Sequence, residues 1–190
     1  MDEIVAQAMA KWPDVPAAYG WLRLDRRGRW RLVDRNAPGF SEAAHGEGTR
    51  LEHAAFADAI CRNYQGDEHG RWYFQNGPQR VFVDLEIAPL VLRVFDAKAG
   101  GCALVAHTGY PVGSVRGGLI DARGDVFVDT DLGVGVVHDA DLAALPLEEG
   151  AGGAMRLVLA TGGALLERAD VDAAERFGFV RRPREAAAAG

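Results

Sequence analysis

The sequence predicts an α+β fold, in which a mainly antiparallel sheet built from hairpins is accompanied by a few short helices. Segments that alternate apolar and polar residues outnumber segments with helical periodicity. Short turns rich in Gly, Asp and Asn separate neighbouring strand segments, and turns of this length join antiparallel strands. The clearest hairpin is residues 70–86, GRWYFQNGPQRVFVDLE.

The 70–86 hairpin is predicted to turn at Gly77-Pro78. Gly in the first position of a type II′ turn takes the positive φ, and Pro in the second keeps its fixed φ. This register places Phe74 opposite Val81 and Trp72 opposite Val83, because side chains alternate along a strand. We therefore expect Trp72 and Phe74 to be buried, with Arg71 facing Asp84 on the other side.

The residues before this hairpin predict a helix, a second hairpin and a second helix. Residues 2–12 carry one apolar stripe and stop at Pro13. Segments 21–24 and 29–32 flank a turn that ends in Gly28, which pairs Leu24 with Trp30. Thr49 and Glu52 resemble a capping box, which predicts a helix from there to about Asn63.

The residues after the central hairpin predict a strand-rich second half. The expected strands are residues 90–95, 102–106, 118–120, 126–129, 133–137 and 155–160. Short helices are expected before Pro146 and before Gly178. We place a division at Gly100-Gly101, which gives an N-terminal half (1–99), a C-terminal β-rich half (100–183) and a frayed tail (184–190). A single compact domain is the alternative.

One turn pattern occurs three times. Asp25, Asp67 and Asp121 each stand three residues before a Gly. An Asp side chain at the start of such a turn accepts hydrogen bonds from the following amides, and Gly supplies the positive φ. Local turn chemistry therefore accounts for the pattern without a binding repeat.

Composition indicates a soluble globular protein. Apolar residues make up 48% of the 190 residues and charged residues 25%, with a net charge of −6. This charge disfavours a general nucleic-acid binder, whose surface is usually basic. No basic leader and no run of ~20 apolar residues occurs, so we expect a cytoplasmic location and no membrane partner. The two cysteines are too few for a disulfide framework.

Standard phosphate-binding and catalytic motifs are missing from the sequence. Residues 113–118 are glycine-rich but lack the Gly-Lys-Ser/Thr ending of a P-loop. Neither serine lies in a GxSxG elbow, and Cys61 and Cys102 both fall in apolar segments where thiols are usually inert. Asp84 and Glu86 share a strand face, but arginines are expected across from them.

No histidine pair has the spacing of a zinc motif. A site assembled from His107, His138 and Asp139 is the least improbable metal site. We expect no metal and no cofactor.

Five blocks of the sequence point to a known family. KWPDVPAAYGWLRLDRRGRW, RWYFQNGPQRVFVDLE, HTG, DLGVGVVHDAD and FGFVRRP occur in this order. Together they resemble a family of uncharacterised proteobacterial proteins that is known only as a domain of unknown function. The resemblance extends from Lys11 to Pro183 and implies a bacterial cytoplasmic protein. It carries no activity, cofactor or catalytic residue.

The polar end of the 70–86 hairpin is the candidate binding site. Gln75, Asn76, Gln79 and Arg80 crowd one end of a hairpin that is otherwise apolar. Amides and a guanidinium suit the recognition of carboxylates, phosphates or peptide groups. Turn chemistry explains Asn76, but it does not explain the other three together.

Three functional hypotheses follow. The leading one is a non-catalytic binding or protein-interaction protein, whose partner is an unknown protein or a small anionic ligand. The alternative is a small-molecule enzyme with an unrecognised site. The second alternative is a nucleic-acid-binding module that uses the Arg-rich 21–35 hairpin, which carries six arginines and two aspartates.

Overall fold

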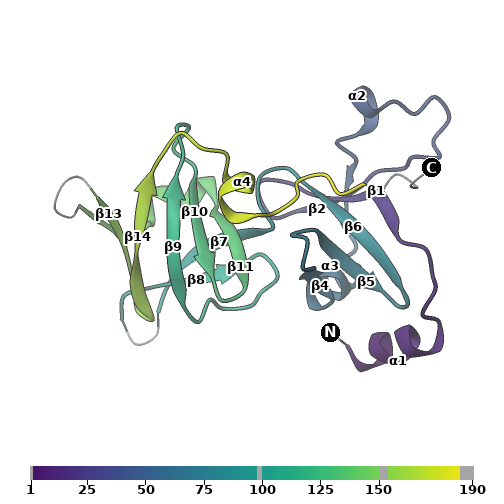
Figure 1. Cartoon of the computed structure of the whole chain (residues 1–190), viewed down its shortest axis with the longest axis horizontal. Helices are drawn as coiled ribbons and strands as arrows, with labels where there is room; N and C mark the ends of the chain where they lie inside the picture. The colour runs from purple at the N-terminus through teal and green to yellow at the C-terminus, as the bar shows by residue number, and fades with distance from the viewer. Residues whose placement is uncertain (1, 98–99, 150–153, 185–190) are drawn as a thin grey trace. The chain divides into compact units, whose positions relative to one another are not determined.

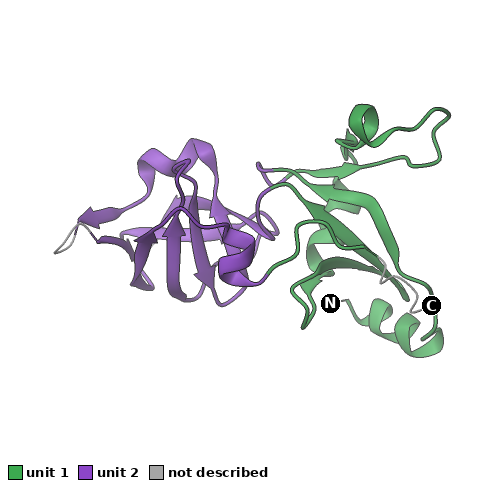
Figure 2. Ribbon diagram, turned by 45° about the horizontal axis from the view of Figure 1, so that its top comes forward, with its two compact units in different colours: residues 1–25, 29–86, 179–190 green, residues 26–28, 87–178 purple. Residues whose placement is uncertain are grey.

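The computed structural model describes residues 2–97, 100–149 and 154–184. Its fold is α+β, as predicted, with two sheets and a few short helices (Figure 1). The chain forms two compact units, which Figure 2 colours separately. Unit 1 comprises residues 1–25, 29–86 and 179–190, and unit 2 comprises residues 26–28 and 87–178.

Unit 1 contains a six-stranded sheet with the strand order β3-β2-β1-β6-β5-β4. Its elements are α1 (Glu3–Lys11), β1 (Ala18–Leu24), β2 (Trp30–Leu32), α2 (Glu42–His45), β3 (Thr49–Arg50), α3 (Ala54–Arg62), β4 (Tyr64–Gly66), β5 (Trp72–Asn76) and β6 (Gln79–Leu85). Neighbouring strands are antiparallel except β1 and β6, which are parallel. Both predicted hairpins are therefore present, and the β1–β6 pairing joins them into one sheet.

The core of unit 1 lies between the sheet and α3. Phe74, Val83, Leu24 and Trp30 are buried on the sheet, and Ile60 is the buried residue of α3. Each of these large apolar side chains stabilises the unit by ~1.5–3 kcal/mol on removal from water.

The predicted second helix is wrong at its start. Thr49 lies in strand β3 and pairs with Leu32, so it caps no helix. Helix α3 begins at Ala54, and the side chain of His53 accepts a hydrogen bond from the Phe56 amide at 3.2 Å. The pairing of Thr49 with β2 therefore replaces the helix start that the capping pattern predicted.

The predicted register of the central hairpin is confirmed, but the burial of Trp72 is not. Phe74 pairs with Val81 and is 4% exposed. Trp72 is only half-buried: it starts β5, pairs with Gly66 of β4, and its ring lies 4.9 Å from that of Tyr64.

The expected pair between Arg71 and Asp84 is also wrong. Arg71 binds Asp67 at 2.7 Å, and Asp84 binds Arg184 at 2.8 Å.

Unit 2 contains an eight-stranded sheet with the order β12-β13-β14-β9-β10-β11-β7-β8. Its elements are β7 (Leu90–Asp96), β8 (Cys102–Ala106), β9 (Val115–Ile120), β10 (Val126–Thr130), β11 (Gly133–Val137), the 3₁₀ helix η1 (Asp139–Ala144), β12 (Leu147–Glu149), β13 (Met155–Leu159), β14 (Gly162–Arg168) and α4 (Ala173–Phe177). The chain directly after β13 lies beside the start of the edge strand β8, where the Ala160 amide donates to the Cys102 carbonyl at 2.8 Å. Leu92, Leu119 and Phe127 are fully buried in its core.

The division into units differs from the division expected at Gly100-Gly101. Strands β7 and β8 lie on either side of these glycines and are antiparallel neighbours within unit 2. Both glycines have a positive φ, which suits a hairpin connection.

The three Asp turns share one geometry. Asp25, Asp67 and Asp121 each accept a hydrogen bond from the amide four residues later, at 2.9–3.0 Å. The Gly of each turn has φ between 72° and 83°. The prediction that local turn chemistry accounts for the repeated Asp pattern is therefore confirmed.

Candidate functional site

The end of the β5–β6 hairpin holds the four predicted site residues. Gln75 pairs with Arg80, and Asn76 pairs with Gln79 one position further out. Gly77 has a φ of 54°, as the predicted turn requires. Alternation along the strands places Gln75 and Arg80 on one face, and directs Asn76 and Gln79 to the other.

The side-chain amide of Gln75 is buried, and only its NH₂ end has a hydrogen-bond partner among the described residues. The residue is 1% exposed, and its Nε2 donates to the Gly77 carbonyl at 2.9 Å. This bond fixes the orientation of the amide, because a carbonyl accepts only from the NH₂ end. Oε1 is buried and has no donor among the described residues. A buried acceptor without a partner costs ~1–3 kcal/mol.

Arg80 is an exposed cation with no carboxylate partner among the described residues. Its guanidinium lies over the ring of Tyr73, with 4.9 Å from Cζ to the ring centroid. It forms no ion pair with any residue in the described ranges. Tyr73 is itself held in place, since its hydroxyl accepts a hydrogen bond from Gln65 at 2.7 Å. The stacking orients Arg80 and leaves its N–H groups available.

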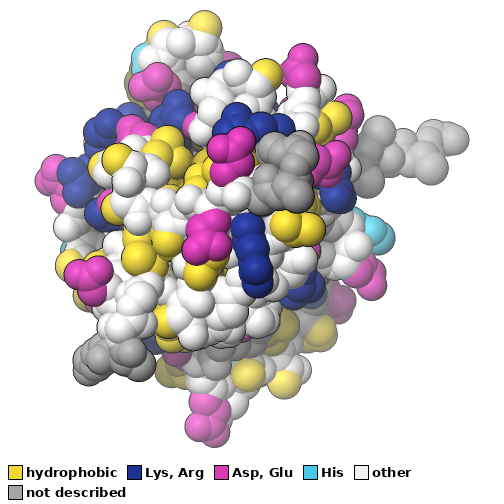
Figure 3. All heavy atoms as spheres, turned by 90° about the vertical axis from the view of Figure 1, so that its left-hand side faces the viewer, with side chains coloured by type: hydrophobic (Ala, Val, Ile, Leu, Met, Phe, Trp, Pro, Cys, Tyr) yellow, Lys and Arg dark blue, Asp and Glu magenta, His cyan; other side chains and the backbone are white. Residues whose placement is uncertain are grey.

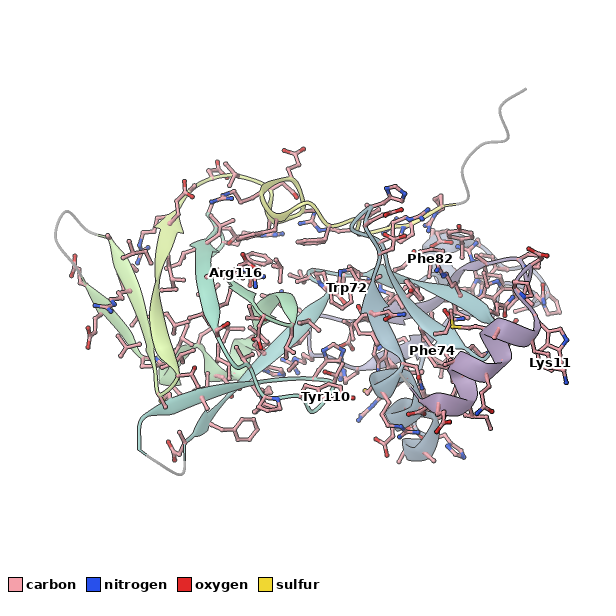
Figure 4. All side chains as sticks on the ribbon, turned by 60° about the horizontal axis from the view of Figure 1, so that its bottom comes forward. Lys11, Trp72, Phe74, Phe82, Tyr110 and Arg116 are labelled. Atoms are coloured by element: carbon pink, nitrogen blue, oxygen red, sulfur yellow. The ribbon has the colours of Figure 1, made fainter. Side chains whose placement is uncertain are left out.

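Gln75 and Arg80 line a cavity of about 240 Å³, which we call the hairpin cavity. Its other lining residues come from α1, from the connection that follows α1 and from the hairpin turn: Met9, Trp12, Pro13, Val15, Ala17 and Pro78. Figure 4 shows α1, marked by the label on Lys11, close to the hairpin that carries Phe74 and Phe82. The cavity therefore combines an apolar wall with one amide and one guanidinium.

Gln79 and Asn76 do not line this cavity. Gln79 donates through Nε2 to the Pro16 carbonyl at 3.0 Å, which fastens the connection to the hairpin. Asn76 is exposed, and its side chain has no hydrogen bond to other described residues. Of the four predicted site residues, Gln75 and Arg80 line the cavity, whereas Asn76 and Gln79 lie next to them in the hairpin.

The apolar wall was missed by sequence reasoning. The sequence predicted that Trp12 belongs to the apolar stripe of the helix over residues 2–12, but Trp12 lies just after α1 and is 51% exposed. The Lys11 ammonium lies 4.5 Å from the centre of its ring. The Trp-Pro step at the end of the helix was the only local signal, since Pro13 directs the chain away from the helix axis.

Helix α1 is attached mainly at its N-terminal end. The Asp2 carboxylate accepts from Asn63 at 3.1 Å and from Arg62 at 3.2 Å, and the Asp2 amide donates to Asn63 at 2.8 Å. The hydrogen bond from Asn63 and the Arg62 charge lower the pKa of Asp2, although burial opposes them. Within the helix only Val5 is buried.

The Arg-rich 21–35 hairpin has its charges matched by acidic groups and carbonyls. Arg26 binds Asp125 and Arg27 binds Asp139, both at 2.9 Å, while Arg29 binds Asp25 at 2.7 Å. Arg23, Arg31 and Arg35 contact backbone carbonyls and the carboxylates of Glu86, Asp25, Glu47 and Glu42. On the face shown in Figure 3, basic and acidic side chains are likewise interspersed.

A larger cavity of about 380 Å³ in unit 1 is lined by Arg23, Asp84, Leu85, Glu86, Arg181 and Arg182. Its carboxylates have internal partners: Asp84 binds Arg184, and Glu86 lies 3.8 Å from Arg23. Unlike the hairpin cavity, it is lined by two carboxylates.

The other constellations from the sequence have structural explanations. The amides of Gly113 and Ser114 donate to the Asp131 carboxylate at 3.0 and 3.2 Å, so the glycine-rich loop binds an anion of its own chain. Cys61 accepts from the Trp30 indole at 3.3 Å, and burial raises the pKa of its thiol. A raised pKa disfavours the nucleophilic thiolate.

The described part of the chain contains no group of three or more His, Cys, Asp and Glu side chains arranged to hold a metal ion. The Nδ1 atoms of His107 and His138 accept backbone hydrogen bonds instead. Across the same ranges, no helix is both long and apolar enough to cross a membrane.

Comparison with known proteins places the chain in a family. The family model DUF2944, whose description is "Protein of unknown function (DUF2946)", matches residues 1–184. The chain belongs to this family. No curated protein matches the sequence.

Two solved structures are similar to this DUF2944 chain. The crystal structure of a DUF1285 family protein from Silicibacter pomeroyi DSS-3 is 17% identical, covers 86% of this chain and 94% of its own, and has a TM-score of 0.52. A DUF1285 family protein from Shewanella baltica OS155 is 16% identical over 65% of this chain and 88% of its own, with a TM-score of 0.43. The first similarity shows a shared fold.

Proposed function

We propose that this DUF2944 protein is a cytoplasmic bacterial binding protein without catalytic activity, and that the hairpin cavity is its binding site. One observation carries the proposal: Gln75, whose buried Oε1 has no donor among the described residues, and Arg80, which has no carboxylate partner among them, line the same cavity. Native proteins rarely leave a buried polar atom without a partner, and a ligand is one explanation for the exceptions. Gln79 supports the site by holding the connection, and Asn76 lies at its rim.

The lining of the cavity favours binding over catalysis. An enzyme of the acid–base type needs a group that exchanges protons near neutral pH. The lining residues contain no carboxylate, imidazole or thiol. An anionic group, on a small molecule or on a protein, is the partner that the guanidinium fits best.

A cytoplasmic location is supported by the two cysteines, which are free thiols, as is usual in reducing compartments. A bacterial source is supported by the resemblance of the sequence blocks to proteobacterial proteins. Nucleic acid is a weaker candidate partner, because the arginines of the 21–35 hairpin are already occupied by the chain's own acceptors.

The test is a titration of isotope-labelled protein with the small-molecule fraction of a bacterial cell extract, followed by NMR. We expect the resonances of the Gln75 amide and the Trp12 indole to shift. Arg80→Ala should abolish these shifts and change stability by less than about 0.5 kcal/mol, because surface substitutions usually fall within this range.

Arg50→Ala is the matched control, because Arg50 is also an exposed arginine of the same sheet without an ion pair among the described residues. It should bind like the wild type. The proposal is refuted if Arg80→Ala loses stability but retains every shift.

A further inference from the structure

Gln75 and Arg80, which line the hairpin cavity, require different chemical groups from a ligand. Gln75 Oε1 is an acceptor, so the ligand must offer an N–H or O–H group. Arg80 offers several N–H groups and a positive charge, so the ligand must also carry an anion. A simple carboxylate such as acetate satisfies only the second requirement.

Gln75 and Arg80 are neighbouring residues of the sheet. Gln75 and Arg80 form a cross-strand pair, and the Cβ atoms of such a pair lie ~4.5–5.5 Å apart. A ligand that binds both must therefore carry its donor and its anion close together. An α-carboxylate and the nitrogen on the same carbon meet this requirement.

The remaining wall of the cavity is apolar. Met9, Trp12, Val15 and Pro78 are among its lining residues. Its volume of about 240 Å³ is below the ~300–1,000 Å³ typical of pockets for drug-sized ligands. The space therefore suits one amino-acid residue with an apolar side chain.

We propose, building on the proposed binding function, that the ligand is an α-amino-acid unit with an apolar side chain, either free or as the C-terminal residue of a peptide. Its carboxylate binds Arg80, its α-nitrogen donates to Gln75 Oε1, and its side chain packs against Met9, Trp12 and Val15.

Entry of this ligand requires a shift of the chain around the cavity, because Gln75 Oε1 is closed to solvent. Helix α1 is the segment that can move to open the cavity. It buries only Val5, so its C-terminal turn has no buried residue of its own. Asp2 holds its N-terminal end, and the hydrogen bond from Gln79 to the Pro16 carbonyl holds the connection that follows it.

The test measures affinity by calorimetry with four probes on the full chain: L-leucine, the tripeptide Ala-Ala-Leu, Ala-Ala-Leu amide and 4-methylpentanoate. The amide lacks the carboxylate, and 4-methylpentanoate lacks the nitrogen. We expect L-leucine or the tripeptide to bind, and the comparison between these two identifies the source of the ligand. The amide and 4-methylpentanoate should each bind at least about tenfold more weakly than the better of the two, since each leaves one protein group without its partner.

Two variants assign the contacts. Arg80→Ala should remove the preference for the tripeptide over its amide, and Gln75→Met should remove the preference for L-leucine over 4-methylpentanoate. Arg50→Ala should keep both preferences.

Failure of the inference is distinguishable from failure of the binding function. If the cell-extract fraction shifts the Gln75 and Trp12 resonances while neither L-leucine nor the tripeptide binds, the ligand class is wrong and the site stands. If neither the extract nor any probe acts on these residues, both proposals are refuted. Equal affinity for 4-methylpentanoate and L-leucine in the wild type also overturns the assignment of Gln75.

Discussion

Replacing Gln75 with Met should make the free protein more stable. The substitution removes Oε1, whose burial without a partner costs ~1–3 kcal/mol. It also removes the Nε2 bond to the Gly77 carbonyl, which contributes ~1 kcal/mol. Water can solvate that carbonyl afterwards, because Gly77 is half-exposed in the turn. Met is unbranched and adapts to the space that Gln leaves. The difference is a net gain of ~0–2 kcal/mol in the free energy of unfolding, with ~1 kcal/mol at its centre.

Urea denaturation measures this gain as a higher midpoint with an unchanged m-value. Gln79→Met is the control, because Gln79 makes its hydrogen bond from a partly exposed position and has no buried unpaired atom. It should lose up to ~1 kcal/mol, the usual contribution of one such bond. A Gln75→Met variant that loses more than about 1 kcal/mol would show that the Gln75 amide is satisfied in the free protein, and the argument for a ligand at Oε1 would fail with it.

Three further predictions concern stability. Phe74→Ala should cost ~3–5 kcal/mol, the usual range for a buried aromatic side chain. Trp72→Ala should cost clearly less, because Trp72 is half-buried. Equal losses of stability in chemical denaturation would contradict these burial assignments. The hydrogen bond and charge of Arg93 lower the pKa of Asp141, so this carboxylate stabilises the fold above its unfolded pKa of ~3.9 and loses that effect as pH falls through the lower folded pKa. Asp141→Asn should therefore be less stable at neutral pH and lose stability less steeply in acid, and an unchanged pH profile would refute the pairing. EDTA should leave the melting temperature unchanged, because the described residues contain no cluster suited to a metal ion; a large decrease would point to a structural metal.

The sequence by itself determined the local geometry of this protein. The register of the 70–86 hairpin, with Gln75 opposite Arg80 and a positive φ at Gly77, followed from alternation and turn chemistry. The 21–32 hairpin, with Leu24 opposite Trp30, followed in the same way. These features depend on residues a few positions apart, so the information that specifies them is local.

Only the tertiary structure decided which segments meet. The parallel pairing of β1 with β6, the pairing of Thr49 with β2, and the position of α1 beside the hairpin join residues far apart in the sequence. A capping pattern such as that at Thr49 contributes only ~1 kcal/mol, which strand pairing and burial outweigh. The candidate site shows the same division. Gln75 and Arg80 were visible as a local pair, whereas the apolar wall with Trp12 exists only because the packing of the whole unit brings α1 and its connection to the hairpin end.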